Sequence, residues 1–259
     1  MSGQKYPAPP GYESFLAGRA HVVAQQPLAG AIREALAAAS LYEFAARQPG
    51  ARALAGRGTA WAAALPNGVE VVVRHTAHGG VLAALTGDLY FAPTRAPHEL
   101  ATALRLAHAG VPTPEVVAYA VYPAFGPFAR ADVATRTLRG ADFPDAWRAT
   151  GDEVARKSLL AALAGLLRSL RAAGALHPDL NLKNVFITPN GDGPTAFVLD
   201  VDRVEFGAAG NAEIGTQNLS RLIRSARKWR KRWNLDIDEF TDLAPLAGTL
   251  GLGRKETGA

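Results

Sequence analysis

The sequence of 259 residues contains no cysteine. Disulfide bonds, zinc–thiolate sites, iron–sulfur clusters and thiol catalysis are therefore excluded, and the absence fits a reducing compartment. Long apolar runs are also missing. The longest stretch without a charged residue covers the fourteen residues 116–129, fewer than the ~20 residues that span a bilayer. The N-terminus lacks the basic segment and following apolar run of a secretory signal. We therefore expect a soluble, cytoplasmic protein.

The composition is that of a folded protein with a basic surface. Hydrophobic residues make up 48% of the chain, which is enough for a sizeable core. The chain has 28 Lys and Arg against 23 Asp and Glu, a formal net charge of +5. This balance suits nucleic acid, anionic lipid or phosphorylated ligands as partners, and it does not choose among them.

Apolar periodicity and turn signals divide the chain into three segments. Residues 1–50 are expected to form an N-terminal extension that contains one helix, over residues 28–48. Residues 51–138 are expected to form a small lobe built on a sheet, because two strand-like runs flank Asn67-Gly68, a strong hairpin signal. The other elements of this lobe are predicted at residues 95–109 (a helix), 115–121 and 132–138 (strands).

The third segment, residues 139–259, is expected to be mainly helical. The sequence predicts a long amphipathic helix over 152–173, with acidic residues in its first turn and Gly174 as its stop signal. Two short strands follow on either side of the turn at 189–193, and a basic helix covers 218–233. Strands in the first half and helices in the second predict an α+β fold.

The sharpest motif follows the long helix, in the segment HPDLNLKN from His177 to Asn184. It matches H-x-D-L-x-x-x-N, the catalytic-loop pattern of protein-kinase-like phosphotransferases. Phosphoryl transfer needs an acidic side chain to accept the proton of the attacking hydroxyl, and an amide oxygen nearby to hold Mg²⁺ on the phosphates. Asp179 is predicted to take the first role and Asn184 the second. The alternative is a surface loop in which both side chains only make turn hydrogen bonds.

A second acidic position favours the catalytic interpretation. Asp200 stands at the end of an apolar strand in the segment FVLDVDR, sixteen residues after Asn184. A strand end beside the catalytic loop is where protein kinases place the Asp of D-F-G, which binds the metal. Asp200 is therefore predicted as the second Mg²⁺ ligand, although Val201 and Asp202 stand in place of the Phe and Gly.

The first lobe offers candidate phosphate-binding residues. Gly56 and Gly58 precede the hairpin in GRGTAW, a shortened glycine-rich loop whose backbone N–H groups can approach phosphates. Arg74 lies in the following strand, where a phosphate-gripping Lys would be expected. Glu99, on the next helix, is the natural partner to orient Arg74. The adenine of ATP is expected beside the linker at 137–141.

Taken together, these segments resemble the bacterial 3-deoxy-D-manno-octulosonic acid (Kdo) kinase and lipopolysaccharide core kinase family, relatives of eukaryotic-type protein kinases. The segments that carry the resemblance lie in order along about two-thirds of the chain: GRGTAW, VVVRHTAHGG with GDLYF, TRAPHEL, GVPTPEVVA, HPDLNLKNVFI, VLDVDR and NLSRLIRSARK. The resemblance implies a two-lobed, protein-kinase-like fold, with a small N-terminal sheet lobe and a mainly helical C-terminal lobe. It also implies ATP- and Mg²⁺-dependent phosphorylation of a Kdo hydroxyl in a lipid A precursor.

The sequence departs from the family pattern at His78, where a basic residue is usual, and at Pro178, where alanine is common. Pro178 also means that the catalytic loop lacks the Arg that couples a protein kinase to its activation-loop phosphate. Only 59 residues follow Asp200, and no Ala-Pro-Glu motif occurs among them. The acceptor is therefore not expected to be a protein segment.

The helix predicted over 218–233 combines an apolar stripe with a basic face. Its seven cations, without an acid among them, are Arg221, Arg224, Arg227, Lys228, Arg230, Lys231 and Arg232. The face is either only solvated, or a surface for anionic lipid and for the phosphates and carboxylates of a lipid A precursor. Nucleic acid is a third possibility, which the lack of a nucleic-acid-binding motif disfavours.

The expected function is an ATP-dependent sugar kinase that phosphorylates Kdo in a lipopolysaccharide inner-core precursor. It would act as a peripheral protein on the cytoplasmic face of the inner membrane, without a nucleic-acid partner. One alternative is a kinase for heptose or another small alcohol. The other is a catalytically inactive kinase-like module that binds nucleotide or a partner, which Arg74 in place of Lys keeps open.

Overall fold

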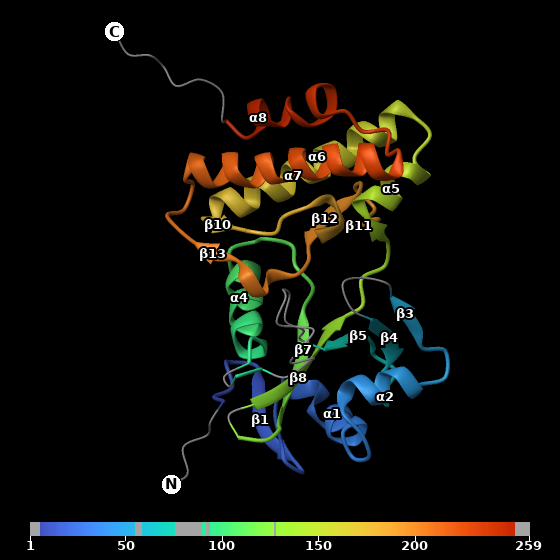
Figure 1. Cartoon of the computed structure of the whole chain (residues 1–259), viewed down its shortest axis with the longest axis vertical. Helices are drawn as coiled ribbons and strands as arrows, with labels where there is room; N and C mark the ends of the chain where they lie inside the picture. Colours follow the sequence, from blue (N-terminus) through green and yellow to red (C-terminus); the bar gives the residue numbers. More distant parts are fainter. Residues whose placement is uncertain (1–5, 55–58, 76–89, 92–93, 127, 252–259) are drawn as a thin grey trace. The chain divides into compact units, whose positions relative to one another are not determined.

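The computed structural model describes two compact units (Figure 1). The first consists of residues 1–101 with 115–137, and the second of residues 102–114 with 138–259. The residues that the structure describes are 6–54, 59–75, 90–91, 94–126 and 128–251.

The first unit is built on an antiparallel sheet of eight strands. The strand order is β1-β2-β7-β8-β5-β4-β3, and the short β6 pairs with β8. The strands are β1 (Tyr12–Ala17), β2 (Ala20–Gln25), β3 (Arg52–Leu54), β4 (Ala60–Ala64), β5 (Glu70–His75), β6 (Tyr90–Phe91), β7 (Val116–Pro123) and β8 (Phe128–Arg136).

The hairpin predicted around Asn67-Gly68 is confirmed as β4 and β5. The two strands pair antiparallel from Ala64 opposite Glu70 to Ala60 opposite Arg74. Gly68 has a φ of +82°, a backbone conformation that L side chains rarely adopt. This hairpin fixes Arg74 near the end of β5.

Residues 1–50 contain more regular structure than the single helix predicted for them. Strands β1 and β2 form a hairpin, and β2 pairs with β7 as part of the main sheet. The predicted helix over 28–48 is corrected to two, α1 (Ala29–Ala35) and α2 (Leu41–Arg47), preceded by a 3₁₀ turn, η1 (Gln26–Leu28).

The break between the two helices has a local cause. Ser40 and Glu43 form a capping box, in which each side chain bonds the other residue's backbone N–H, so a new helix begins at residue 41. Val22, Ile32 and Leu41 are fully buried in one apolar cluster with the sheet. The segment is therefore part of the core of the first unit.

Helix α4 (Ala96–His108) lies close to the bounds predicted for it. The division between the two units falls within it, after Ala101. Glu99, in its first turn, therefore belongs to the first unit.

The second unit is mainly helical, with two small antiparallel sheets. Its helices are α5 (Phe143–Ala149), α6 (Glu153–Ala172), α7 (Ala212–Trp233), a π-helical turn η4 (Glu239–Leu243) and α8 (Leu246–Thr249). One sheet has the order β12-β11-β9 and the other pairs β10 with β13. Their strands are β9 (Ala141–Asp142), β10 (Ala175–Leu176), β11 (Val185–Thr188), β12 (Thr195–Val198) and β13 (Glu205–Phe206).

Helix α6 confirms the long amphipathic helix of the sequence. Its buried stripe includes Leu159, Leu163 and Leu170, and it packs against α7 and β12. Gly174 ends the helix with a φ of +65°, and a Cβ at this position would lie 2.5 Å from the carbonyl oxygen of Gly207. Only glycine fits this turn, from which the chain enters β10 and then the HPDLNLKN loop.

Helix α7 begins six residues earlier than predicted. Asn211 accepts a hydrogen bond from the backbone N–H of Glu213 and caps the helix, so that the segment before Asn218 is helical as well. Within the described residues, no helix is both long enough and apolar enough to cross a membrane.

Candidate active site

The loop from His177 to Asn184 is fixed by its own backbone and by buried side chains. His177 is fully buried, and its Nε2 lies 3.0 Å from the carbonyl oxygen of Leu199. Because a carbonyl only accepts, Nε2 carries the proton. Burial lowers the pKa of His177, so the ring is held neutral. His177 thus anchors the loop through this hydrogen bond.

Helix α7 fastens the same loop from three successive turns. Buried Asn218 accepts from the backbone N–H of His177 and donates to the carbonyl of Ala175. Arg221 donates to the carbonyl of Pro178, and Ser225 accepts from the backbone N–H of Leu182. The sequence reasoning treated α7 only as a basic surface and missed this function. The available signal was the presence of Asn and Ser on its otherwise apolar stripe.

The structure brings Asp179 and Asn184 together. The side-chain amides of Asn181 and Asn184 both donate to the backbone carbonyl of Asp179, at 2.9 Å and 3.1 Å. The Oδ1 of Asn184 accepts no hydrogen bond from the described residues. The loop therefore offers two oxygen groups: the partly exposed carboxylate of Asp179 and the amide oxygen of Asn184.

Asp200 is joined to this loop through the backbone. The N–H of Leu199 donates to the carbonyl of Asn184 at 2.8 Å, directly before Asp200. Asp200 has φ 56° and ψ 51°, the left-handed region, which only one other described non-glycine residue, Asn234, occupies. Backbone strain of this kind costs roughly 1–3 kcal/mol and clusters at functional sites. A carboxylate and an amide oxygen on adjoining segments are the hard oxygen ligands that suit Mg²⁺.

Arg203 is a residue of this site that the sequence reasoning did not single out. It ends the 3₁₀ turn η3 (Val201–Arg203), directly after Asp200. Its Nη1 lies 2.8 Å from Oδ2 of Asp179. The only signal in the sequence was a cation three residues after a predicted metal ligand.

In the first unit, Arg74 and Glu99 form an ion pair. Nη2 of Arg74 lies 2.5 Å from Oε1 of Glu99, whose side chain is 4% exposed. The pair joins β5 to α4. The roles assigned to these two residues in phosphate binding stay predictions, and Gly56, Gly58 and His78 lie outside the described residues.

The pair predicts a measurable energetic coupling. Arg74→Met removes the cation that lies 2.5 Å from the buried Glu99 and is expected to lower the free energy of unfolding by roughly 2 kcal/mol or more. The double variant Arg74→Met/Glu99→Leu is expected to recover most of this loss, because both charges are gone. Urea unfolding of the single and double variants measures the coupling. A coupling free energy close to zero would show that the contact contributes nothing.

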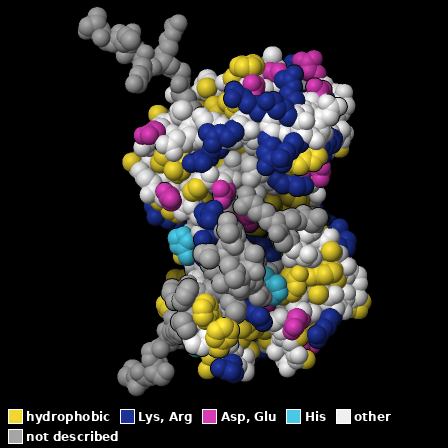
Figure 2. Space-filling model, viewed as in Figure 1, with side chains coloured by type: hydrophobic (Ala, Val, Ile, Leu, Met, Phe, Trp, Pro, Cys, Tyr) yellow, Lys and Arg dark blue, Asp and Glu magenta, His cyan; other side chains and the backbone are white. Residues whose placement is uncertain are grey.

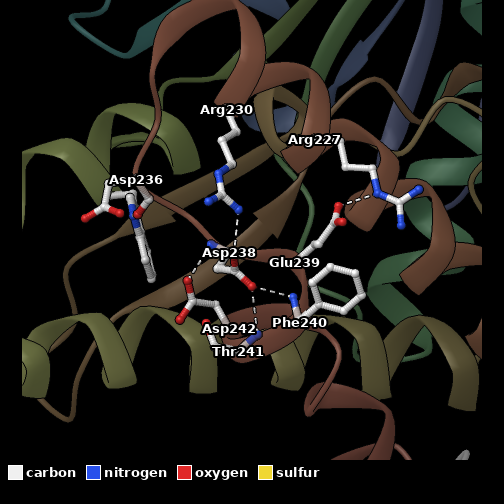
Figure 3. Close-up of polar contacts among 9 residues, drawn as sticks. Arg227, Arg230, Asp236, Asp238, Glu239, Phe240, Thr241 and Asp242 are labelled. Carbon is white, nitrogen blue, oxygen red and sulfur yellow. Dashed lines mark hydrogen bonds and ion pairs between the residues drawn. The ribbon is translucent and has the colours of Figure 1, made fainter.

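The basic face of α7 is partly occupied by the chain itself (Figure 3). Arg227 pairs with Glu239, and Nη1 of Arg230 lies 2.6 Å from Oδ2 of Asp238. Asp238 also accepts from the backbone N–H groups of Thr241 and Phe240, and these bonds lower its pKa. Arg221 donates to the carbonyl of Pro178, so three of the seven cations have a hydrogen-bonded or ionic partner within the chain. The remaining four have no acidic partner among the described residues: Arg224, Lys228, Lys231 and Arg232.

Comparisons with known proteins identify the family of the chain. The model of the lipopolysaccharide kinase (Kdo/WaaP) family matches residues 45–242. A protein of Haemophilus influenzae named 3-deoxy-D-manno-octulosonic acid kinase is 29% identical over 177 residues, which cover 66% of this chain and 72% of the relative. One of the same name from Actinobacillus succinogenes is 29% identical over 193 residues, 71% of this chain and 78% of the relative.

A solved structure, described as WaaP in complex with acyl carrier protein, shares the fold. It superimposes with a TM-score of 0.50 at 16% identity, over 90% of this chain and 99% of that one. The prediction of a kinase-like fold of mixed helices and sheets is confirmed. The chain is a kinase of lipopolysaccharide biosynthesis and belongs to the lipopolysaccharide kinase (Kdo/WaaP) family.

Proposed function

We propose that this kinase uses ATP and Mg²⁺ to phosphorylate a Kdo hydroxyl of a lipopolysaccharide inner-core precursor. The observation that carries the proposal is that two hydrogen bonds within one unit connect the segments of Asp179, Asn184 and Asp200: the Asn184 side-chain amide donates to the Asp179 carbonyl, and the Leu199 N–H donates to the Asn184 carbonyl. The relatives named 3-deoxy-D-manno-octulosonic acid kinase support the acceptor. In this proposal the first unit serves as the nucleotide-binding lobe and the second as the catalytic lobe.

The residues of the loop divide the chemistry between them. Asp179 accepts the proton of the acceptor hydroxyl as its oxygen bonds to the γ-phosphorus and the bond to the leaving ADP breaks. Asn184 and Asp200 are the ligands for Mg²⁺, which when bound neutralises charge on the phosphates. His177, Asn218 and the backbone bonds of the loop keep these groups in place without touching substrate.

The residues of the first unit would bind the nucleotide. Arg74, oriented by Glu99, is suited to grip a phosphate with its planar guanidinium. Gly56 and Gly58 are proposed to bring backbone N–H groups to the phosphates. The adenine is proposed to lie beside residues 137–141.

A comparison of acceptors tests the proposed function. Labelled ATP is supplied with three acceptors that differ only in their sugars: a Kdo-bearing lipid A precursor, the Kdo-free precursor and a heptosylated core. We expect rapid label transfer to the Kdo-bearing precursor and none to the Kdo-free one. Preferential transfer to the heptose would assign the alternative, a heptose kinase. Transfer to none of them, with intact nucleotide binding, would refute the proposed acceptor and point to another sugar or alcohol.

We further propose that the four cations of α7 without acidic partners bind the anionic surface of the inner membrane. Lys and Arg side chains gather over the helical unit (Figure 2). Two exposed aromatic residues lie in the same part of the chain: Trp233, which is 45% exposed and tilted against Trp229, and Phe240, which is 70% exposed. Cations with interleaved aromatic residues are typical of surfaces that bind the membrane interface.

Substitution of the unpaired cations is expected to weaken membrane binding without affecting the site. Each cation near an anionic surface contributes about 1 kcal/mol, so Arg224→Gln/Lys228→Gln/Lys231→Gln should lower vesicle partitioning roughly 100-fold. Activity on a soluble acceptor analogue should be retained. Co-sedimentation with anionic vesicles at low and high salt measures the loss, which should shrink as salt screens the charges.

A matched control keeps the change in net charge and moves it elsewhere. Arg19, Arg47 and Arg52 are exposed in the first unit, and their triple Gln variant should sediment like the wild type. Equal losses for the two triple variants would mean that net charge alone drives binding. No loss for the α7 variant at low salt would leave only a solvated helix.

A further inference from the structure

Arg203 occupies an unusual position for a surface cation, beside the proposed proton acceptor. It contacts Asp179 through one terminal nitrogen at 2.8 Å, and its side chain is 42% exposed. Arg203 donates no other hydrogen bond to the described residues. The hydrogen bond to Asp179 and the negative charges of Asp179 and Asp202 raise the pKa of Arg203. Most of the five N–H donors of the guanidinium thus remain available to a ligand.

Stability does not account for this pair. A pair this exposed contributes only about 0–1 kcal/mol to stability. The position of Arg203 would be explained by an anionic group of the substrate that binds this cation close to the reacting hydroxyl.

A second guanidinium stands at the same loop. Arg221 donates to the carbonyl of Pro178, the residue before Asp179, and its buried Nε has no partner among the described residues. Two guanidinium groups therefore contact consecutive residues of the loop. The surroundings of Asp179 are thus suited to an anionic acceptor.

We propose that Arg203 binds the carboxylate of the acceptor sugar and so selects a sugar acid over a neutral sugar. The inference rests on the proposed function, in which the acceptor is Kdo, an acid. The reacting hydroxyl must come within about 2.6–3.2 Å of Asp179. A carboxylate bound to the other N–H groups of Arg203 would then lie about the width of one sugar ring from that hydroxyl. A guanidinium receives a carboxylate through two parallel hydrogen bonds, which a neutral sugar cannot offer.

Two acceptors and three variants test this selection. The acceptors are the Kdo-bearing lipid A precursor and the same molecule with the carboxylate of its reacting Kdo esterified. For the wild type, kcat/KM is expected to be about 10- to 100-fold higher with the acid, the usual effect of one charge-assisted hydrogen bond. Arg203→Met should lower kcat/KM for the acid by a similar factor and bring the acid-to-ester ratio close to one.

The remaining variants separate charge from geometry. Arg203→Lys keeps a charge without the planar fork and should restore part of the ratio. Arg47→Gln removes an exposed cation of the first unit and should keep the wild-type ratio. Each variant is also measured for its KM for ATP, which the proposal expects to stay unchanged.

Four results would overturn the selection by Arg203. An Arg203→Met variant that loses kcat equally on both acceptors would show that Arg203 only positions Asp179. A raised KM for ATP with an unchanged ratio would assign it to a nucleotide phosphate. A wild type that phosphorylates acid and ester alike would refute the inference but leave the proposed function standing, whereas a wild type that phosphorylates only heptosylated acceptors would refute both.

Discussion

Asp179→Asn is expected to reduce phosphoryl transfer to background while nucleotide affinity stays nearly unchanged. The substitution removes the proton acceptor, whose contribution is typically about 10²–10⁴-fold. The loop should keep its shape, because Asn181 and Asn184 bind the backbone carbonyl of residue 179, which the variant retains. An Asn side chain can also still accept from Arg203 through its oxygen.

The measurement pairs turnover on the Kdo-bearing acceptor with calorimetry of nucleotide binding. Asp192→Asn is the matched control, since Asp192 is exposed in the turn between β11 and β12, and it should behave as the wild type. A variant at 179 that turns over at the wild-type rate would remove Asp179 from the mechanism.

Asp200→Ala is expected to abolish the Mg²⁺-dependent binding of ATP. Mg²⁺ is held by only one or two carboxylates in such sites, and the hydrogen bond from the Leu199 N–H to the Asn184 carbonyl joins the backbone next to Asp200 to the loop. Alanine also tolerates the left-handed backbone of residue 200 less well than Asp or Asn. Asp200→Asn therefore serves as the second variant, which keeps the backbone conformation and removes only the charge.

Calorimetry with ATP, in the presence and absence of Mg²⁺, reads out this effect directly. Both variants at 200 should lose the gain in affinity that Mg²⁺ gives the wild type. Asn184→Ala should bind more nearly like the wild type and show a severe loss of rate. Equal affinity for Mg²⁺–ATP in the wild type and in both variants at 200 would refute the metal-binding role.

The parts of the fold that the sequence predicts well have local causes. The β4–β5 hairpin follows from Asn67-Gly68 between alternating residues, and α6 from a regular stripe of leucines that ends at Gly174. The register of β2 against β7 joins residues about a hundred positions apart, His21 with Val121. No short-range pattern specifies the pairing of β2 with β7. The β1–β2 hairpin is local, with Gly18 at its turn, and the sequence analysis did not identify it.

In the candidate site, too, the residues with local sequence signals were predicted and the long-range contacts were not. Asp179, Asn184 and Asp200 could be named because their spacing is local and their chemistry restricts the residue types. The contact of Arg203 with Asp179 depends on how η3 folds back onto the loop. Arg227 and Arg230 pair with Glu239 and Asp238, at the start of η4. The sequence after α7 has no hydrophobic periodicity that would predict this contact. The basic face of α7 is therefore smaller than its seven cations suggest.

Mass spectrometry of the reaction product tests directly whether the kinase phosphorylates Kdo and whether this reaction needs Asp179. The purified kinase is incubated with ATP, Mg²⁺ and the Kdo-bearing lipid A precursor, and the product is fragmented to locate any added phosphate. The account predicts one added phosphoryl group, on the Kdo fragment, formed by the wild type and absent with Asp179→Asn. A phosphate on another sugar or on the lipid A part, or the same product from Asp179→Asn, would contradict it.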